Sequence, residues 1–282
     1  MKKQVIVATD SGANLPQTLI EKYDIQVIPL WVQIGDRSYR DGVDIQPLEF
    51  FRRLREKVGR MATSQPSLGE FLEFYRGLRE RAEGVVAVHL VGRYSGVLNV
   101  ARAAAAELAP FPIEVVDSGN IAMAEGFAVL VAARAAEAGA SLREVVERVK
   151  AVVPRIDLVA MVDSLEYAVR GGRLASAARL LDSLLNIKPL VRIHNGELGV
   201  ISQARTRAKG LRRMVEELAE KVGDAPCHVA VLYSDAVEEA ERLRDEIVAR
   251  LRCVEVHFLP VAPVLGVHAG PGAVGLAFYA GE

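Results

Sequence analysis

The chain has 282 residues, of which 51% are hydrophobic and 25% are charged, and its formal net charge at pH 7 is −1. This length suits about two domains, and the composition is that of an ordinary globular protein. A charge so close to zero argues against nucleic acid or an anionic membrane surface as a partner.

Cysteine and histidine usage argues against a disulfide framework and against a metal site. The two cysteines, Cys227 and Cys253, lie far apart without a CxxC motif, and the five histidines are scattered. A reducing compartment is the simpler interpretation of two isolated thiols. The chain enters a strand-like run directly, and no uninterrupted apolar stretch is long enough to span a bilayer. We therefore expect a cytoplasmic protein without a metal ion or a membrane insertion.

In the first half of the chain, short apolar runs alternate with amphipathic runs. Strands are predicted at residues 5–9, 25–34, 85–90 and 113–116. Helices are predicted at residues 15–23, 47–58, 94–108, 122–138 and 141–153, and a further helix begins at Ser67. This alternation predicts βα units around a mostly parallel sheet.

The pattern changes after Pro154, which we take as a domain boundary. Asp163-Ser164 should cap a short helix that ends at Gly171, and a second helix should follow to about residue 184. Asn195-Gly196 between two apolar runs, 186–193 and 197–201, predicts a hairpin. The remaining elements are helices at 206–221 and 236–250 and strands at 156–162, 229–233, 254–258 and 274–279.

These patterns predict an α/β fold with two α/β domains. The first domain, residues 1–155, should have the mostly parallel sheet, and the second, residues 156–282, should have a mixed sheet. Residues 61–80 form a segment that could pack with the second domain.

The stretch Thr63-Ser64-Gln65-Pro66-Ser67 is the first candidate for a binding site. Pro66 fixes its own φ and favours an extended Gln65, and Ser67 is a good N-cap for the helix that follows. We expect Thr63 and Ser64 on a stiff, non-helical turn just before that helix. Hydroxyls and free amides in such a place can hold a carboxylate or a phosphate. On this stretch alone a plain capping turn is the favoured explanation, because Ser and Thr prefer turns and caps for their own reasons.

Three predicted strands end in Asp-Ser, at positions 10, 117 and 163. These residues either cap the helices that follow or lie at the strand ends where open α/β sheets bind ligands. The sequence leaves both interpretations open.

Two further motifs resemble catalytic or cofactor-binding signatures without matching their context. Gly270 to Gly275 spells GxGxxG, but only a terminal strand follows it, so we reject a dinucleotide site and expect a rigid turn that presents His268. The run from Gly92 to Gly96 places Ser95 in a GxxSG spacing instead of the GxSxG of a nucleophile elbow. Ser95 should follow a strand and begin a helix, where it offers a hydroxyl beside free amides, and capping alone is an equally good account.

Taken together, these motifs resemble the DegV family of bacterial fatty-acid-binding proteins over essentially the whole chain. The matching stretches occur in the family's order: Asp10-Ser11, Ile28-Pro29-Leu30, Tyr39-Arg40-Asp41-Gly42, Thr63-Ser64-Gln65-Pro66-Ser67, Ser95-Gly96, Asp117-Ser118, Leu165-Glu166-Tyr167, Gly171-Gly172-Arg173, Leu185-Asn186-Ile187-Lys188-Pro189, Arg205, and His268-Ala269-Gly270-Pro271-Gly272. The chain departs from the family's usual SGTY at Val97-Leu98 and from its usual HTGPG at Ala269.

The resemblance implies a DegV-like fold of two α/β domains with one long-chain fatty acid buried between or within them. It implies that Thr63 and Ser95 hold the carboxylate, and that Ser64, Gly96, Arg205 and His268 lie near the same head group. Such proteins look like carriers, so the resemblance implies a chain without its own catalytic activity or cofactor. They present the carboxylate to a partner fatty acid kinase, which makes an acyl phosphate for phospholipid metabolism.

Elementary energetics agree with a lipid site but do not identify it. Burying an acyl chain of about 16 carbons releases roughly 10 kcal/mol before ordering costs, and hydroxyls with a basic group can satisfy the carboxylate. The alternative is an acyl hydrolase or thioesterase that uses Ser95 as nucleophile and His268 as base. A regulator that binds a phosphate ester in the same loop is a further alternative.

Overall fold

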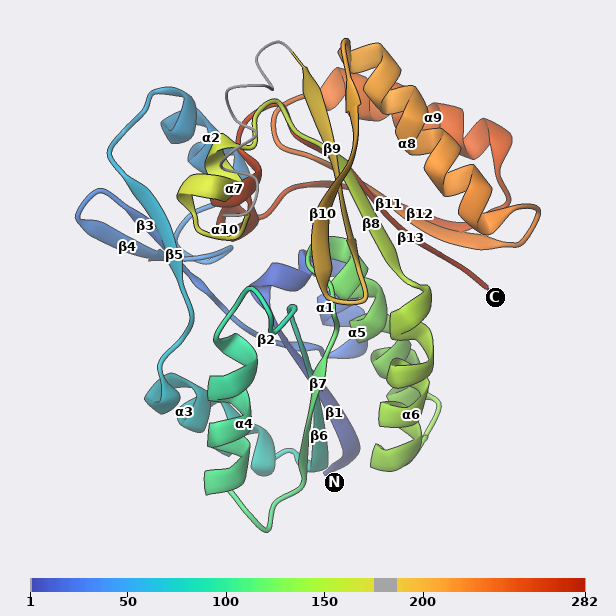
Figure 1. Ribbon diagram of the computed structural model, residues 1–282. Helices are drawn as coiled ribbons and strands as arrows, with labels where there is room; N and C mark the ends of the chain where they lie inside the picture. Colours follow the sequence, from blue (N-terminus) through green and yellow to red (C-terminus); the bar gives the residue numbers. More distant parts are fainter. Residues whose placement is uncertain (1, 175–186, 282) are drawn as a thin grey trace.

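The computed structural model describes residues 2–174 and 187–281. Figure 1 shows two α/β parts that meet across the middle of the molecule, with a small sheet to one side of the interface. The predicted helix that reaches residue 184 and the Leu185-Asn186 part of one motif lie outside the described residues. No described helix combines the length and apolar character that a bilayer crossing requires.

The N-terminal part is built on a parallel four-stranded sheet in the order β2-β1-β6-β7. Its strands are β1 (Lys3–Asp10), β2 (Gln26–Ile28), β6 (Ala82–His89) and β7 (Ile113–Asp117). Six of the eight residues in β1 and seven of the eight in β6 are buried, as expected for parallel strands covered on both faces. The predicted parallel sheet is confirmed.

Helices lie on both sides of this sheet (Figure 1). On one side are α3 (Leu68–Arg79) and α4 (Val97–Glu107), and on the other are α5 (Ala122–Glu137) and α6 (Leu142–Val152). The short elements of this part are η1 (Ser11–Ala13), α1 (Gln17–Tyr23), α2 (Pro47–Arg55) and η2 (Val153–Arg155). Ser67 and Ser141 cap α3 and α6 as predicted, and each forms a capping box with the glutamate three residues on.

The C-terminal part contains a mixed six-stranded sheet in the order β10-β9-β8-β13-β11-β12. Among the described strands of this sheet, only β11 and β12 pair in parallel, and the predicted hairpin at Asn195-Gly196 is the antiparallel pair β9–β10. The strands are β8 (Asp157–Met161), β9 (Lys188–His194), β10 (Glu197–Ala204), β11 (Cys227–Tyr233), β12 (Cys253–Pro260) and β13 (Val274–Ala280). The helices are α7 (Glu166–Arg170), α8 (Arg207–Val222), α9 (Val237–Arg250) and α10 (Pro263–Ala269).

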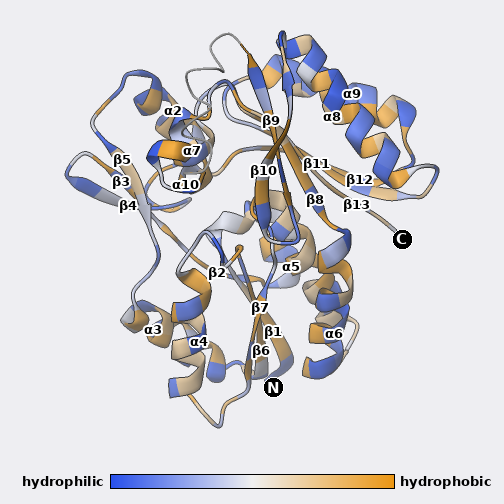
Figure 2. Ribbon diagram, in the orientation of Figure 1, coloured by the Kyte–Doolittle hydropathy of each residue, from blue (hydrophilic) through white to orange (hydrophobic). Residues whose placement is uncertain are grey.

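The faces of the six-stranded sheet have different neighbours. In Figure 2 the central strands are coloured hydrophobic, whereas α8 and α9 carry hydrophilic colours over much of their length. Val159 and Met161 of β8 share a core with α8, and Leu232 and Ala277 belong to a second core that extends into the N-terminal part. The two parts therefore share apolar packing, and the division at residue 155 stays a prediction.

The predicted strand at residues 25–34 is wrong, because the chain changes sheets within it. β2 pairs with β1, whereas β3 (Trp31–Ile34) is the centre of an antiparallel three-stranded sheet in the order β4-β3-β5. Pro29 has no N–H for the first ladder, and the Leu30 N–H donates to the Ser11 hydroxyl oxygen at 3.0 Å. The flanking strands are β4 (Arg37–Arg40) and β5 (Met61–Ser64).

Two local predictions around the candidate site are also corrected. Thr63 and Ser64 lie in β5 rather than on a turn, paired with Val32 and Trp31. Extended backbone before a proline suits a strand as well as a turn, and pairing with β3 decides between them. His268 lies on α10 rather than in a glycine-rich turn; that helix ends at Ala269, and Gly270 follows with φ 73°.

Candidate functional site

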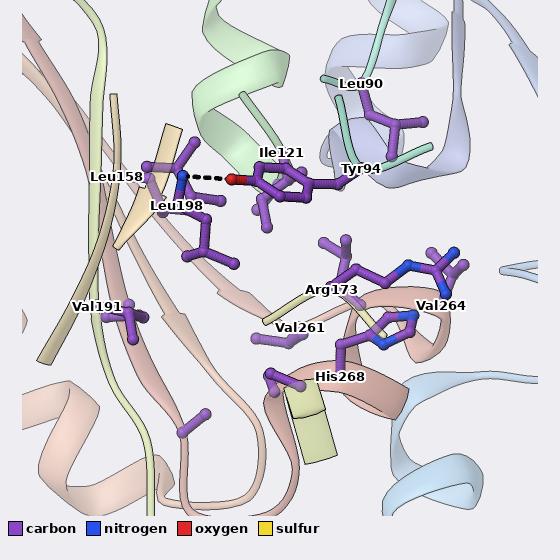
Figure 3. Close-up of a pocket in the computed structure, with 18 of the residues that line it drawn as sticks. Leu90, Tyr94, Ile121, Leu158, Arg173, Val191, Leu198, Val261, Val264 and His268 are labelled. Carbon is purple, nitrogen blue, oxygen red and sulfur yellow. Dashed lines mark hydrogen bonds between the residues drawn. The ribbon is translucent and has the colours of Figure 1, made fainter. Parts of the chain in front are cut away.

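A cavity of about 290 Å³ lies between the two parts of the chain, close to the lower end of the volumes usual for small-molecule sites. One wall consists of residues that follow the carboxyl ends of the parallel strands, including Leu90 after β6 and Ile121 after β7. This edge is where ligands bind in open α/β sheets. The facing wall is the six-stranded sheet, with Leu158, Val191 and Leu198 (Figure 3).

Strand periodicity explains why the second wall is apolar on the cavity side. Leu158 and Ala160 line the cavity, whereas Val159 between them packs into the core beneath α8. Successive side chains of a strand point to opposite faces, so one buried strand serves two apolar environments.

Polar side chains gather at one end of this cavity. Thr63 and Ser64 reach it from β5, and His268 reaches it from α10. Ser95 joins them from the loop before α4. That loop lies against the end of β5, because a Cβ on Gly96 would come within 2.6 Å of the Gln65 amide oxygen. Four of the six predicted site residues therefore line the cavity, and Gly96 lies beside them against Gln65.

His268 is held in a defined position at this end. Its Nε2 lies 3.0 Å from the Thr63 hydroxyl oxygen. Nδ1 is buried without a partner among the described residues and lies against Gly171, where a Cβ would overlap it. Burial, with a smaller effect of the Arg173 charge, lowers the pKa of His268 to about 4. The imidazole is therefore neutral at pH 7.

Arg173 supplies the positive charge of this end, a role that the sequence analysis did not assign. Figure 3 shows its side chain beside His268. Its guanidinium Nη1 donates to the Gly171 carbonyl at 2.6 Å, and burial lowers the pKa of the guanidinium. No carboxylate among the described residues forms an ion pair with it. A partly desolvated cation of this kind favours an anionic ligand. The only sequence signal was the motif Gly171-Gly172-Arg173, which names the residue but not its burial.

Arg205 is the predicted site residue that the structure does not bring to the cavity. Its side chain is exposed in the turn between β10 and α8, and it is absent from the cavity lining. The turn after α7 instead delivers Arg173.

Among the three Asp-Ser pairs, Asp10 is the residue that caps the helical element after it, the short η1. The N-cap positions of α5 and α7 are Ile121 and Leu165, which make no side-chain cap hydrogen bond, so the capping interpretation is wrong for the other two pairs. Asp10 accepts a hydrogen bond from Gly12 N, and Asp117 accepts one from Gly119 N. Ser95, which lines the cavity, accepts a hydrogen bond at 3.3 Å from Val97 N, at the first residue of α4. Ser164 accepts a hydrogen bond from Glu166 N, at the first residue of α7, and is the one residue of the three pairs in the cavity lining.

The β9–β10 hairpin closes the cavity on one side. Leu198 N donates to the Tyr94 hydroxyl oxygen at 3.0 Å, the dashed contact in Figure 3. At the hairpin turn, Gly196 N donates to the Gly119 carbonyl at 3.1 Å. These bonds join the hairpin to loops of the N-terminal part.

The family model described as "Uncharacterised protein, DegV family" matches residues 4–281. The chain belongs to the DegV family. A DegV domain-containing protein of Streptomyces coelicolor is 36% identical over 278 residues, which cover 98% of each chain.

Solved structures of fatty-acid-binding proteins superpose closely on this chain. The fatty-acid-binding DegV protein of Thermus thermophilus has a TM-score of 0.92 and 31% identity, covering 98% of this chain and 99% of that chain. A stearic-acid-binding protein of Eubacterium ventriosum has a TM-score of 0.86 and 26% identity, covering 99% and 98%. The DegV fold is thereby confirmed. Within the described part of this DegV chain, no group of three His, Cys, Asp or Glu side chains could hold a metal ion.

Proposed function

We propose that this DegV-family chain binds one long-chain fatty acid, with the acyl tail in the cavity and the carboxylate at the polar end. The observation that carries the proposal is an apolar cavity with Thr63, Ser95 and His268 at one end and Arg173 beside them. The fatty-acid-binding relatives of the same fold support it.

The energetics of the site suit a fatty acid. Each methylene removed from water contributes about 0.8 kcal/mol, so an alkyl tail of about 16 carbons is the main source of affinity. A carboxylate in the same cavity needs hydrogen bonds and a counter-charge, which the hydroxyls and Arg173 are placed to provide. A neutral His268 adds a hydrogen-bonding group without a second desolvated charge.

We further propose that the chain is a cytoplasmic carrier which presents the carboxylate to a fatty acid kinase and has no catalytic activity of its own. The polar end is near the surface, because Ser64 lines the cavity and is exposed. Arg205, whose side chain is also exposed, is proposed to lie on the surface that meets the kinase. The free thiols of Cys227 and Cys253 suit a reducing compartment.

The hydrolase alternative is disfavoured by the contacts of His268. Nε2 contacts Thr63 rather than Ser95, and no described carboxylate accepts a hydrogen bond from Nδ1. A nucleophile–base pair needs both arrangements to resemble a catalytic triad.

The test is to denature the purified protein, extract it and measure bound lipid by mass spectrometry. We expect one fatty acid per chain, and uptake of added palmitate or oleate by delipidated protein. A protein that purifies without bound lipid and also fails to take up palmitate or oleate would contradict the proposal. Steady release of free acid from an acyl ester or thioester would favour the hydrolase instead. Adding a fatty acid kinase and ATP should then yield acyl phosphate.

A further inference from the structure

Two of the matching motifs have no role in the site described so far. One is Asp10-Ser11, where β1 ends and a turn begins, and the other is the Tyr39-Arg40-Asp41-Gly42 stretch, which begins in the last two residues of β4. Both reach the same short segment, residues 260–264, which joins β12 to α10. This segment leads from the six-stranded sheet into α10, which contacts β3 and β5 of the three-stranded sheet.

Asn14 makes two hydrogen bonds to this segment. Its side-chain oxygen accepts from Ala262 N at 2.6 Å, and its side-chain nitrogen donates to the Pro260 carbonyl at 3.1 Å. Asn14 itself has φ 51°, a left-handed conformation that asparagine tolerates better than most residues. The amide therefore holds one peptide group on each side of Val261, a residue that lines the cavity.

Asp41 holds the next part of the segment. Its carboxylate Oδ1 accepts a hydrogen bond from Val264 N, in the first turn of α10, at 3.2 Å. Only 2% of Asp41 is exposed, and its Oδ2 has no partner among the described residues. A buried acid directed at a helix start satisfies an amide that the helix itself leaves free.

α10 depends on such external contacts because it is short and lies outside the sheets. Its Gly266 packs so closely on α2 that a Cβ there would come within 2.6 Å of the Phe50 ring. Val264, Leu265 and His268 of this helix all line the cavity. Any shift of its first turn would therefore move the imidazole that contacts Thr63.

We propose that Asp41 and Asn14 are positioning residues, which fix the start of α10 so that His268 stays within hydrogen-bonding distance of Thr63 at the polar end. The link to fatty acid affinity rests on the proposed function. The link to the placement of His268 rests on the contacts alone.

The first experiment measures palmitate affinity of the delipidated full chain by calorimetry. Asp41→Ala and Asn14→Ala should each bind about tenfold more weakly, which corresponds to about 1.4 kcal/mol. Asp41→Asn keeps an oxygen that can accept from Val264 N and should bind within about twofold of the wild type. Asp44→Ala is the matched control, because Asp44 lies on the same loop but pairs with the exposed Arg40. Equal losses in Asp41→Ala and Asp44→Ala would overturn the proposal.

A mutant cycle tests whether Asp41 acts through His268. If it does, Asp41→Ala should cause no further loss of affinity in a His268→Ala background, because the two effects share one contact. Fully additive losses would overturn the proposal. If Asp41→Ala does not fold, the same cycle is run with Asn14→Ala.

A second readout does not require ligand. The imidazole resonances of His268, assigned by comparison with His268→Gln, should titrate closer to the ordinary histidine value in Asp41→Ala than in the wild type. An unchanged titration in a folded variant would contradict the positioning role. If the wild type binds no fatty acid, the proposed function fails, but this measurement still decides whether Asp41 places His268.

Discussion

His268 Nε2 and Thr63 Oγ1 lie 3.0 Å apart although the two residues are separated by 205 positions in the sequence. Thr63 comes from β5 of the three-stranded sheet, and His268 comes from a helix that the chain forms only after completing β12. The contact therefore exists only when the last segment of the chain has packed against an early one. Residues from both the N-terminal and the C-terminal part of the chain therefore form the polar end of the cavity.

The Thr63 hydroxyl should contribute directly to fatty acid affinity. Thr63→Val keeps the shape and removes the hydrogen bond, so we expect palmitate binding to weaken about 10-fold to 150-fold, corresponding to about 1.5–3 kcal/mol for a bond to a charged group. Ser95→Ala should act in the same direction. Thr63→Ser, which keeps a hydroxyl, is the control. Calorimetry on delipidated protein measures the effect, and equal affinity of Thr63→Val and Thr63→Ser would contradict it.

Gly171 should be required because His268 occupies the space of its absent side chain. A Cβ would overlap Nδ1 of His268, and the φ of −74° gives no other reason for glycine. We expect Gly171→Ala to lower the free energy of unfolding by about 1–3 kcal/mol and to weaken palmitate binding. Gly77→Ala is the control: it lies in α3 with open space around it and should stabilise by up to about 1 kcal/mol. Urea unfolding distinguishes the two, and similar effects would be evidence against the role of Gly171.

Asp41 should make stability depend on pH between about 4 and 7. Burial, with a smaller effect of Asp10, raises the pKa of Asp41 from 3.8 to about 7 in the folded chain. The folded chain then keeps a proton that the unfolded chain has released, so this contribution is present below pH 4 and is lost as the pH rises to 7. In Asp41→Asn, the free energy of unfolding relative to the wild type should rise across this range and level off above it. A constant difference from pH 4 to pH 8 would show that Asp41 does not titrate there.

Tyr94 should slow the exchange of bound lipid. Its hydroxyl oxygen accepts from Leu198 N, one of the bonds that hold the β9–β10 hairpin against the N-terminal part. Tyr94→Phe removes that bond and leaves the ring, so dissociation of a fluorescent fatty acid should accelerate about twofold to tenfold, as expected for one net hydrogen bond. Tyr233→Phe removes a hydroxyl outside the cavity lining and should leave the rate unchanged. Identical dissociation rates in the wild type, Tyr94→Phe and Tyr233→Phe would show that the hairpin contact does not limit lipid exchange.

The two arginines should separate ligand binding from the proposed transfer to a kinase. Arg173 lines the cavity, so Arg173→Gln should weaken palmitate binding about tenfold by removing the counter-charge. Arg205 is exposed, so Arg205→Gln should bind normally and slow acyl-phosphate formation by the kinase. Binding and turnover are measured on the same preparations. Weakened palmitate binding in Arg205→Gln would show that its side chain reaches the ligand after all.

The features that the sequence determined by itself are the ones that depend on neighbouring residues. Ser67 and Glu70 form a capping box within four residues, and Asn195-Gly196 forms its turn from its own backbone preferences. The alternation of apolar and amphipathic runs likewise predicted the parallel and the mixed sheet, because each element needs one buried face. The order of the motifs, including Thr63 and Ser95, was sufficient to indicate the family.

Only the tertiary structure decided which residues meet. The apolar run that contains Pro29 divides between two sheets, because its first part pairs with β1 and its second part pairs with β5. Arg173 and Arg205 both lie in turns, but Arg173 lines the cavity whereas Arg205 is exposed to solvent. The difference arises because the burial of each side chain depends on the residues that pack over its turn. The placement of His268 depends on contacts that Asn14 and Asp41 make from the other end of the chain. Such contacts join residues more than two hundred positions apart, so no local pattern can encode them.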